Sequence, residues 1–299
     1  MISIIIPFFN ERENLPILYK ELVTQLEPMN RAYELVFVND GSTDESGVYA
    51  SKLAETDSHV VFVNNRKRSG KGNALANGIR NAKGNIYIFM DADLQNDPKD
   101  IPHFLEKIDA GYDLINGVRD GRDDNSLIRM YSRLGNKFVK RFLKSPFTDI
   151  NSGYKAIRKE VLQEFTLYSN NFRFMPLAAY MKGFKVGEVK IHNRPRSHGV
   201  SKFGTSKIFI GLIDTLTAYF LYQFSERPLH FFGIIGGVFF AIGFFYTVFL
   251  TIERLFYGML LYRRPALLYS ILFIIVGIQI IMTGFIGELI VYFHKRLKS

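Results

Sequence analysis

The sequence contains no cysteine and no tryptophan. Without cysteine, disulfide bonds and thiolate metal sites are excluded, which fits a reducing compartment. The start of the sequence also lacks a secretory signal, because its first apolar run reaches only Pro7 and is soon followed by the charged residues Glu11 and Arg12. We therefore expect the larger, N-terminal part of the chain to lie in the cytoplasm.

Charged residues are missing from two long segments near the C-terminus. Residues 230–252 give 23 positions without Asp, Glu, Lys or Arg, and residues 266–287 give 22. Each segment is long enough to cross a bilayer core of about 30 Å as a helix, whereas the core helices of soluble domains, the alternative interpretation, are usually shorter. Residues 229–299 are therefore predicted to form a two-helix transmembrane hairpin in the cell membrane. Its spans lie at about 230–252 and 266–290, and a basic tail follows them.

Gly233 and Gly237 form a G-x-x-x-G pair inside the first predicted span. Small residues at this spacing let two membrane helices approach closely. Two partners for this face remain open, namely the second helix of the hairpin or a neighbouring subunit. The second case predicts a homo-oligomer.

The net charge of +10 is concentrated late in the chain. From Lys190 onward there are 12 Lys or Arg residues and 4 Asp or Glu residues. Basic residues beside membrane helices indicate contact with anionic lipid headgroups and not with nucleic acid. Residues 208–224 are mostly apolar and aromatic but contain Asp214, so we predict an interfacial helix and connector over residues 206–228. A third span is disfavoured by the short length and the internal acid.

The N-terminal part shows the pattern of an α/β protein. Apolar runs at 2–9, 33–38, 60–63 and 86–90 alternate with segments of helical spacing. Nearly continuous apolar strands are typical of a parallel sheet that helices cover on both faces, which is a nucleotide-binding architecture. Further strands are predicted at 113–117 and 186–191, and further helices near 73–81 and 97–111. Ser42 and Glu45 have the spacing of a capping box and predict a helix start there.

Polar residues follow these strands where each one ends. Asn10 and Glu11 follow the first strand, Asp40 the second, and Asp91-Ala92-Asp93-Leu94-Gln95 the fourth. Ligands bind at the carboxyl ends of strands in such sheets, and two carboxylates with an amide oxygen suit Mg²⁺ or Mn²⁺. The pattern predicts a metal site that holds a substrate diphosphate. An acidic surface turn is the alternative, and for Asp40 the alternative is a turn-forming residue before glycine.

Two basic regions are open to two interpretations each. The loop at residues 65–72 is rich in Lys, Arg and Gly but has the spacing of neither the P-loop nor the dinucleotide fingerprint, so it faces either a phosphate or solvent. Arg129, Ser132, Arg133 and Asn136 share one face of a predicted helix, and this face either binds an anion or is exposed.

Five motifs, taken in order, resemble the family 2 glycosyltransferases, and within them the polyprenyl-phosphate sugar transferases. They are Pro7 to Glu11, Val38 to Asp44, Gly70 to Gly78, Asp91 to Gln95, and Arg196 to Phe203. The resemblance covers the whole chain. It implies a GT-A-like (Rossmann-like) catalytic domain at residues 1–205, a nucleotide-sugar donor and a polyprenyl-phosphate acceptor.

The resemblance also implies roles for residues at matching positions. Asp91, Asp93 and Gln95 would hold the divalent metal, and Arg119 and Arg133 would act in catalysis together with the acidic pair. The nucleotide sugar would contact Pro7, Asn10, Glu11, Asp40, Lys71, Asp91, Ala92, Asp93 and Asp149. The lipid phosphate would contact Arg119, Ser132, Arg133, Arg196 and Lys202.

Two absences separate the chain from other branches of that family. Residues 169–174 contain no carboxylate where members that act on sugar hydroxyls carry an acidic base, and the lack of tryptophan excludes the Q-x-x-R-W motif of processive synthases. An anionic lipid phosphate needs no general base, so both absences favour it as the acceptor. The prediction is an inverting transfer of one sugar from a UDP- or GDP-hexose. A transferase acting on a lipid-linked sugar hydroxyl, or a non-catalytic membrane scaffold, is the alternative.

Overall fold

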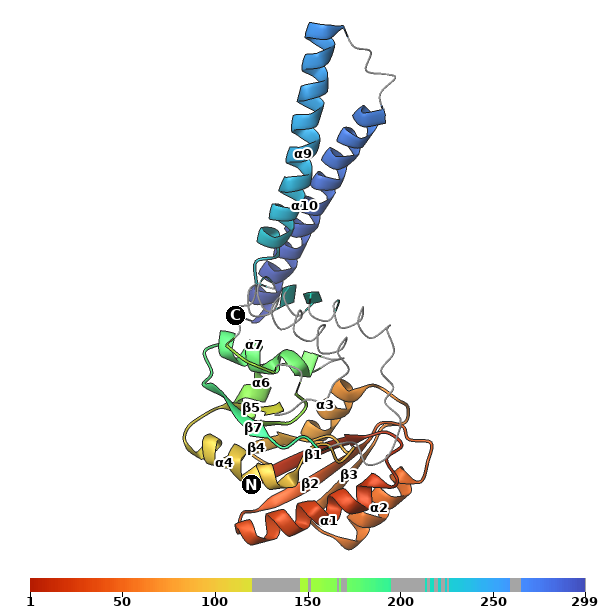
Figure 1. The fold of residues 1–299 in the computed structure, drawn as a ribbon, viewed down its shortest axis with the longest axis vertical. Coiled ribbons are helices and arrows are strands. Elements are labelled where there is room, and N and C mark those ends of the chain that lie inside the picture. Colours follow the sequence, from red (N-terminus) through yellow and green to blue (C-terminus); the bar gives the residue numbers. More distant parts are fainter. Residues whose placement is uncertain are drawn as a thin grey trace. The chain divides into compact units, whose positions relative to one another are not determined.

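The computed structural model describes residues 1–119, 146–149, 152–165, 167, 171–194, 226–258 and 265–298, with a few positions between 213 and 224. The chain forms two compact units, Met1–Thr215 and Leu216–Ser299 (Figure 1). The predicted interfacial helix at 206–228 lies largely outside the described residues.

The first unit is built on a seven-stranded sheet with the order β3-β2-β1-β4-β6-β5-β7. Among the described strands β6 alone runs antiparallel, pairing with β4 on one side and β5 on the other. The α/β, mostly parallel, GT-A-like fold is confirmed, and the antiparallel strand β6 begins two residues after Gly153. The strands are β1 Ile2–Phe8, β2 Tyr33–Asn39, β3 Val60–Asn64, β4 Ile86–Phe89, β5 Leu114–Arg119, β6 Lys155–Arg158 and β7 Val186–Ile191.

Helices cover both faces of the sheet, which explains why its strands are apolar at almost every position (Figure 1). One core joins alternate strand residues to α1, α2 and α4, and the other joins the remaining strand residues to α3, α6 and α7. The helices are α1 Asn14–Leu26, α2 Ser46–Thr56, α3 Lys71–Asn81, α4 Ile101–Asp109, α6 Lys159–Gln163 and α7 Met175–Met181. Short 3₁₀ turns are η1 Glu27–Met29, η2 Pro98–Asp100 and η3 Asn171–Phe174.

The capping box predicted at Ser42 and Glu45 is wrong. Helix α2 begins at Ser46, and Glu45 makes no side-chain cap. The Ser42 hydroxyl accepts instead from the backbone N–H of Asn10, at 3.0 Å, so a contact with another loop replaces the local one. Asp97 does cap a helical turn, since its carboxylate accepts from the backbone N–H of Lys99 at the start of η2.

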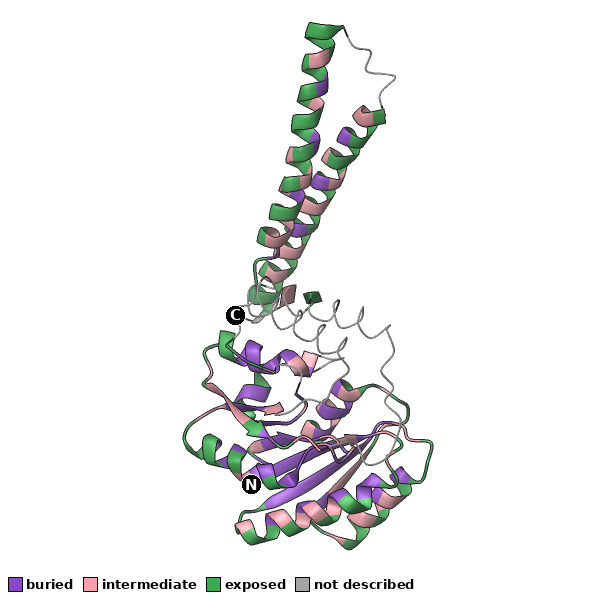
Figure 2. Ribbon diagram, viewed as in Figure 1, coloured by how far each residue is buried: buried purple, intermediate pink, exposed green. Residues whose placement is uncertain are grey.

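The second unit contains two long apolar helices, α9 Pro228–Tyr257 and α10 Pro265–Lys298. Both are long and apolar enough to cross a membrane, and only 17% and 11% of their most apolar windows are buried, unlike core helices of a soluble protein (Figure 2). They extend beyond the predicted spans, and Glu288 on α10 accepts from the backbone N–H of Leu229 near the start of α9.

The contact between α9 and α10 does not use the predicted glycine pair. A Cβ on Gly236 would lie 2.6 Å from the Gly277 carbonyl oxygen, and a Cβ on Gly243 would lie 2.6 Å from that of Ser270. A Cβ on Gly237 would meet nothing within 4 Å, and one on Gly233 only its own helix. The prediction that Gly233 and Gly237 pack the hairpin is therefore wrong, and their contact with a neighbouring subunit stays a prediction.

Candidate active site

The predicted site residues that the structure describes lie at the carboxyl edge of the sheet. Because β1, β2, β4 and β5 run in the same direction, the loops that follow them open at one edge. Helix α3 begins at this edge with Lys71, and the segment before β6 returns to it with Gly153. The sheet topology thus assembles residues from six separate stretches of the chain.

Asp91, which follows β4, forms an ion pair with Lys71 through its Oδ1 atom. Gly153 lies directly against this pair, since a Cβ added there would sit 2.6 Å from Lys71 Nζ and 2.8 Å from Asp91 Oδ2. Lys71 Nζ also lies 4.9 Å from the centre of the Phe172 ring. The pair is therefore held by a helix start, a strand end and a glycine that admits no side chain.

The charge of Asp91 is stabilised by surrounding cations. Burial acts to raise the pKa of this carboxyl, but attraction and hydrogen bonding from Lys71, with attraction from Arg119 and Arg173, outweigh burial and lower the pKa below its ordinary value. Asp91 is thus a carboxylate at neutral pH. The same cations make the surroundings suited to a diphosphate.

The next residues form a tight turn that presents further oxygen atoms. Leu94 has φ of 60°, a left-handed backbone that is unusual for leucine, and its side chain is buried. Asp93 Oδ1 accepts from the backbone N–H of Gln95 at 3.3 Å. The carboxylates of Asp91 and Asp93 and the amide oxygen of Gln95 are hard donors, so the residues present fit Mg²⁺ or Mn²⁺.

Arg119, at the end of β5, is held by Asp149. Its Nε and Nη2 atoms donate to the two carboxylate oxygens of Asp149, at 2.9 and 3.2 Å. The Asp149 backbone carbonyl in turn accepts from the amide of Asn116, at 2.7 Å. A guanidinium anchored on one carboxylate is pre-oriented, and Arg119 is close enough to Asp91 to lower its pKa.

Asp40, after β2, holds the basic loop at residues 65–70. Its Oδ1 accepts from Asn65 Nδ2 and from the backbone N–H and hydroxyl of Ser69, and its Oδ2 accepts from the backbone N–H of Gly70 at 2.9 Å. Burial acts to raise the pKa of Asp40, but these donors lower it. Asp40 therefore fixes the chain just before Lys71, and its predicted contact with the base stays a prediction.

Asn10 and Glu11 tie the end of β1 to the start of α2. Asn10, with φ of 57°, accepts from the backbone N–H of Thr43 at 2.8 Å, and the backbone N–H of Glu11 donates to the hydroxyl of Ser46, the first residue of α2, at 2.9 Å. Pro7 lies near the end of β1, and Ala92, which is buried, follows β4. The structure places all four at the predicted edge of the sheet, and their contact with the nucleotide sugar stays a prediction.

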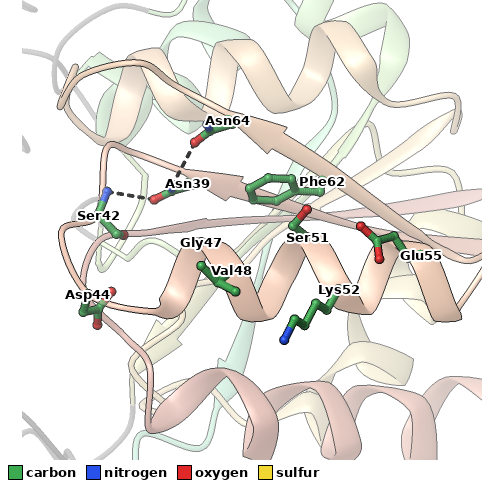
Figure 3. Close-up of a pocket in the computed structure, with 10 residues that line it drawn as sticks. All are labelled: Asn39, Ser42, Asp44, Gly47, Val48, Ser51, Lys52, Glu55, Phe62 and Asn64. Carbon is green, nitrogen blue, oxygen red and sulfur yellow. Dashed lines mark hydrogen bonds between the residues drawn. The ribbon is translucent and has the colours of Figure 1, made fainter.

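A pocket of about 530 Å³ lies between α2 and the ends of β2 and β3 (Figure 3). Asn39 spans its upper end, donating to Asn64 and accepting from the backbone N–H of Ser42. Asp91 and Asp93 do not line this pocket. The pocket borders the loop that binds Asn10, and it is separate from the predicted metal ligands.

Residues after β7 are joined to the acidic motif. The backbone N–H of Arg194 donates to the Gln95 carbonyl at 3.0 Å, and its guanidinium pairs with Asp97 and Glu21. His192 donates through its backbone to Asp100, and its ring bonds to the same carboxylate, which raises the pKa of His192. The chain thus leaves the sheet beside the predicted metal ligands.

Four predicted residues, Ser132, Arg133, Arg196 and Lys202, lie outside the described residues, as do Arg129 and Asn136. The structure also reveals residues that the sequence did not single out. Phe172 lies against Lys71, Arg173 is close enough to Asp91 to lower its pKa, and the buried Asn116 and Lys155 bond to each other. In the sequence, two of these residues could have been noticed as a polar Asn116 within an apolar strand and a lysine at the start of another strand.

Comparison with known proteins identifies the family of the chain. The chain matches the family described as Glycosyl transferase family 2 over residues 3–166. The chain therefore belongs to the family 2 glycosyltransferases, and within that family it is of the polyprenyl-phosphate type, as the motifs predict.

Two relatives illustrate that branch. An undecaprenyl-phosphate 4-deoxy-4-formamido-L-arabinose transferase of Shewanella sediminis is 34% identical over 300 residues, covering 100% of this chain and 89% of the relative. A dodecaprenyl-phosphate galacturonate synthase of Rhizobium johnstonii is 29% identical, covering 99% and 89%.

The fold is shared with glucosyl-3-phosphoglycerate synthase of Mycobacterium tuberculosis. Its crystal structure with Mn²⁺, UDP and glucosyl-3-phosphoglycerate has a TM-score of 0.56, 18% identity, and coverage of 76% of this chain and 82% of that one. At 18% identity, the structural similarity supports only the fold of the first unit.

Proposed function

We propose that the chain transfers one sugar from a UDP- or GDP-hexose to polyprenyl phosphate at the cytoplasmic membrane face, with inversion at the anomeric carbon. The enzyme is a metal-dependent glycosyltransferase, and its sugar donor is a nucleotide sugar. The observation that carries the proposal is the grouping of Asp91, Lys71, Arg119 and Asp149 at one sheet edge, in a chain that also holds two candidate membrane spans.

The donor side of the reaction needs its leaving diphosphate stabilised. A divalent metal, Mg²⁺ or Mn²⁺, held by Asp91, Asp93 and Gln95, would neutralise charge on that diphosphate. Lys71 lies beside Asp91 at the start of α3, where its ammonium group can bind a phosphate oxygen. These residues supply positive charge where negative charge develops, which lowers the barrier to departure.

The acceptor side needs orientation and no general base. A lipid phosphate is anionic near neutral pH, so it can attack without losing a proton to the protein. The described segment at η3 presents Phe172 and Arg173 toward Asp91 and contains no carboxylate. Arg119 would bind the acceptor phosphate, with Ser132, Arg133, Arg196 and Lys202 completing that site.

A panel assay tests the proposal. Full-length protein in detergent is incubated with undecaprenyl phosphate and each common UDP- or GDP-sugar, with Mn²⁺, with Mg²⁺, or with EDTA. We expect one donor to give a sugar-lipid product that mild acid hydrolyses, as a phosphodiester-linked sugar requires, and no product with EDTA. An acid-stable product would indicate a sugar hydroxyl acceptor, and the absence of any metal-dependent transfer would contradict the proposal.

A further inference from the structure

Lys155, the first residue of β6, is fully buried between β4 and β5. Its Nζ atom donates to Asn116 Oδ1 at 2.9 Å and to the backbone carbonyl of Ser152. Within the described part of the chain no carboxylate lies within 4 Å of this ammonium group. Burying a charge without a paired carboxylate costs free energy, and an uncharged side chain of similar length, such as methionine, avoids that cost.

The hydrogen bonds of Lys155 and Asn116 show what the buried lysine does. Asn116 is also fully buried, and its amide donates to the Asp149 carbonyl at 2.7 Å. Together the two side chains bind the backbone carbonyls of Asp149 and Ser152 and so hold the backbone at both residues. Each of these two held positions lies next to residues of the candidate active site.

One held position controls Arg119. The Asp149 side chain binds both the Nε and Nη2 atoms of Arg119, so a displacement of the Asp149 backbone moves the guanidinium. The other held position affects the ion pair of Lys71 and Asp91, because Gly153 directly follows Ser152 and lies against both side chains. A single buried contact between Lys155 and Asn116 thus supports both the donor and the acceptor halves of the site.

We propose that Lys155, acting with Asn116, is a positioning residue of the transfer reaction. It fixes residues 149 and 152–153 so that Arg119 and the Asp91–Lys71 pair keep their relative places. This inference rests on the proposed roles of Asp91 and Arg119. Lys155 touches no reacting atom in this scheme, so its effect is expected on turnover and not on the affinity for the donor.

The test compares Lys155→Met and Asn116→Ala with the double variant, in full-length protein and with the donor that the panel identifies. A displacement of about 1 Å costs on the order of 100-fold in rate, so each single variant is expected to lower kcat by about 100-fold, with KM for the donor within about threefold of wild type. Because the two residues form one contact, the double variant is expected to match the slower single variant. Multiplied losses, or kcat values within threefold of wild type, would overturn the inference.

Ser3→Ala is the stability-matched control. Ser3 is also fully buried and bonds to Glu34 and to the backbone N–H of Gly84, at the amino end of the sheet. Its loss is expected to lower the unfolding temperature while leaving kcat unchanged, and an equal loss of kcat would show that stability alone explains the effect. Folding of each variant is checked by the thermal shift that UDP or GDP with Mn²⁺ produces. If Lys155→Met fails this check, Asn116→Ala carries the test.

Asp91→Asn and Arg119→Met run in parallel to separate two kinds of failure. If these two variants lose activity while Lys155→Met and Asn116→Ala retain it, the positioning inference alone is wrong. If Asp91→Asn and Arg119→Met retain activity, the proposed site is wrong, and the inference falls with it.

Discussion

Replacing Gly153 with alanine places a methyl group against the pair formed by Lys71 and Asp91. The new Cβ would lie 2.6 Å from Lys71 Nζ and 2.8 Å from Asp91 Oδ2, whereas ordinary contact begins at 3.4 Å. These atoms must therefore move by 0.8 Å and 0.6 Å, the differences between those distances. The Lys71 ammonium can swing away, but Asp91 follows a buried strand and passes its displacement to the other predicted metal ligands, Asp93 and Gln95.

We expect Gly153→Ala to lower kcat by about 10- to 100-fold, because displacements approaching 1 Å cost up to roughly 100-fold. Stability should change little, since the atom under most pressure ends a flexible side chain and alanine restricts the unfolded chain more than glycine does. The measurement is transfer of labelled sugar to undecaprenyl phosphate, with thermal unfolding recorded on the same samples.

Gly111→Ala is the matched control for this substitution. Gly111 has φ of 86° and open space where its Cβ would be, so alanine there introduces backbone strain of about 1 kcal/mol and no contact with the site. Its unfolding temperature should fall while kcat stays at the wild-type value. A Gly153→Ala enzyme with wild-type kcat and KM would refute the view that this close approach sets the geometry of Asp91.

Three further outcomes are expected. Asp93→Ala should reduce transfer by at least about 100-fold and weaken Mn²⁺ binding measured by EPR, with the protein still folded and membrane-bound; retained activity would remove the metal assignment. Arg119→Lys loses the two-point contact with Asp149 and should raise KM for the lipid about 10-fold at unchanged donor KM, which acceptor titrations check. Burial lowers the pKa of Lys155 in the folded protein to about 7, from 10.5. Between pH 7 and 10.5, Lys155 therefore carries a proton in the unfolded chain but has lost it in the folded protein. Wild type should therefore gain about 2 kcal/mol in the free energy of unfolding from pH 7 to 9. Thermal unfolding of wild type and Lys155→Met measures this, and an equal pH response in both would contradict it.

Much of the catalytic fold follows from local patterns in the chain. A strand buried on both faces must be apolar at nearly every position, so β1, β2 and β4 are visible as apolar runs. The polar residues that close these runs, including Asp40 and Asp91, then share one edge because the strands are parallel. The predicted metal-binding motif and the two apolar helices are equally local signals.

Local patterns failed where a distant group competes for the same atom. Ser42 has the spacing of a helix cap, but its hydroxyl accepts from Asn10, which is 32 positions away in the sequence. In the helix hairpin, Gly236 and Gly243 meet α10 where Gly233 and Gly237 do not. Successive helix residues point about 100° apart, so the face used for packing depends on the partner helix.

The order of residues is enough to predict a parallel α/β domain with acidic residues at its strand ends, and an apolar two-helix segment after it. Which atoms meet became visible only in the folded chain. Folding pairs Lys71 with Asp91 and Asp149 with Arg119, and it bonds the buried Lys155 to the backbone carbonyl of Ser152. The physical reason is that periodicity reports whether a residue is buried, whereas side-chain pairing depends on strand order and register, which arise only when the whole core packs.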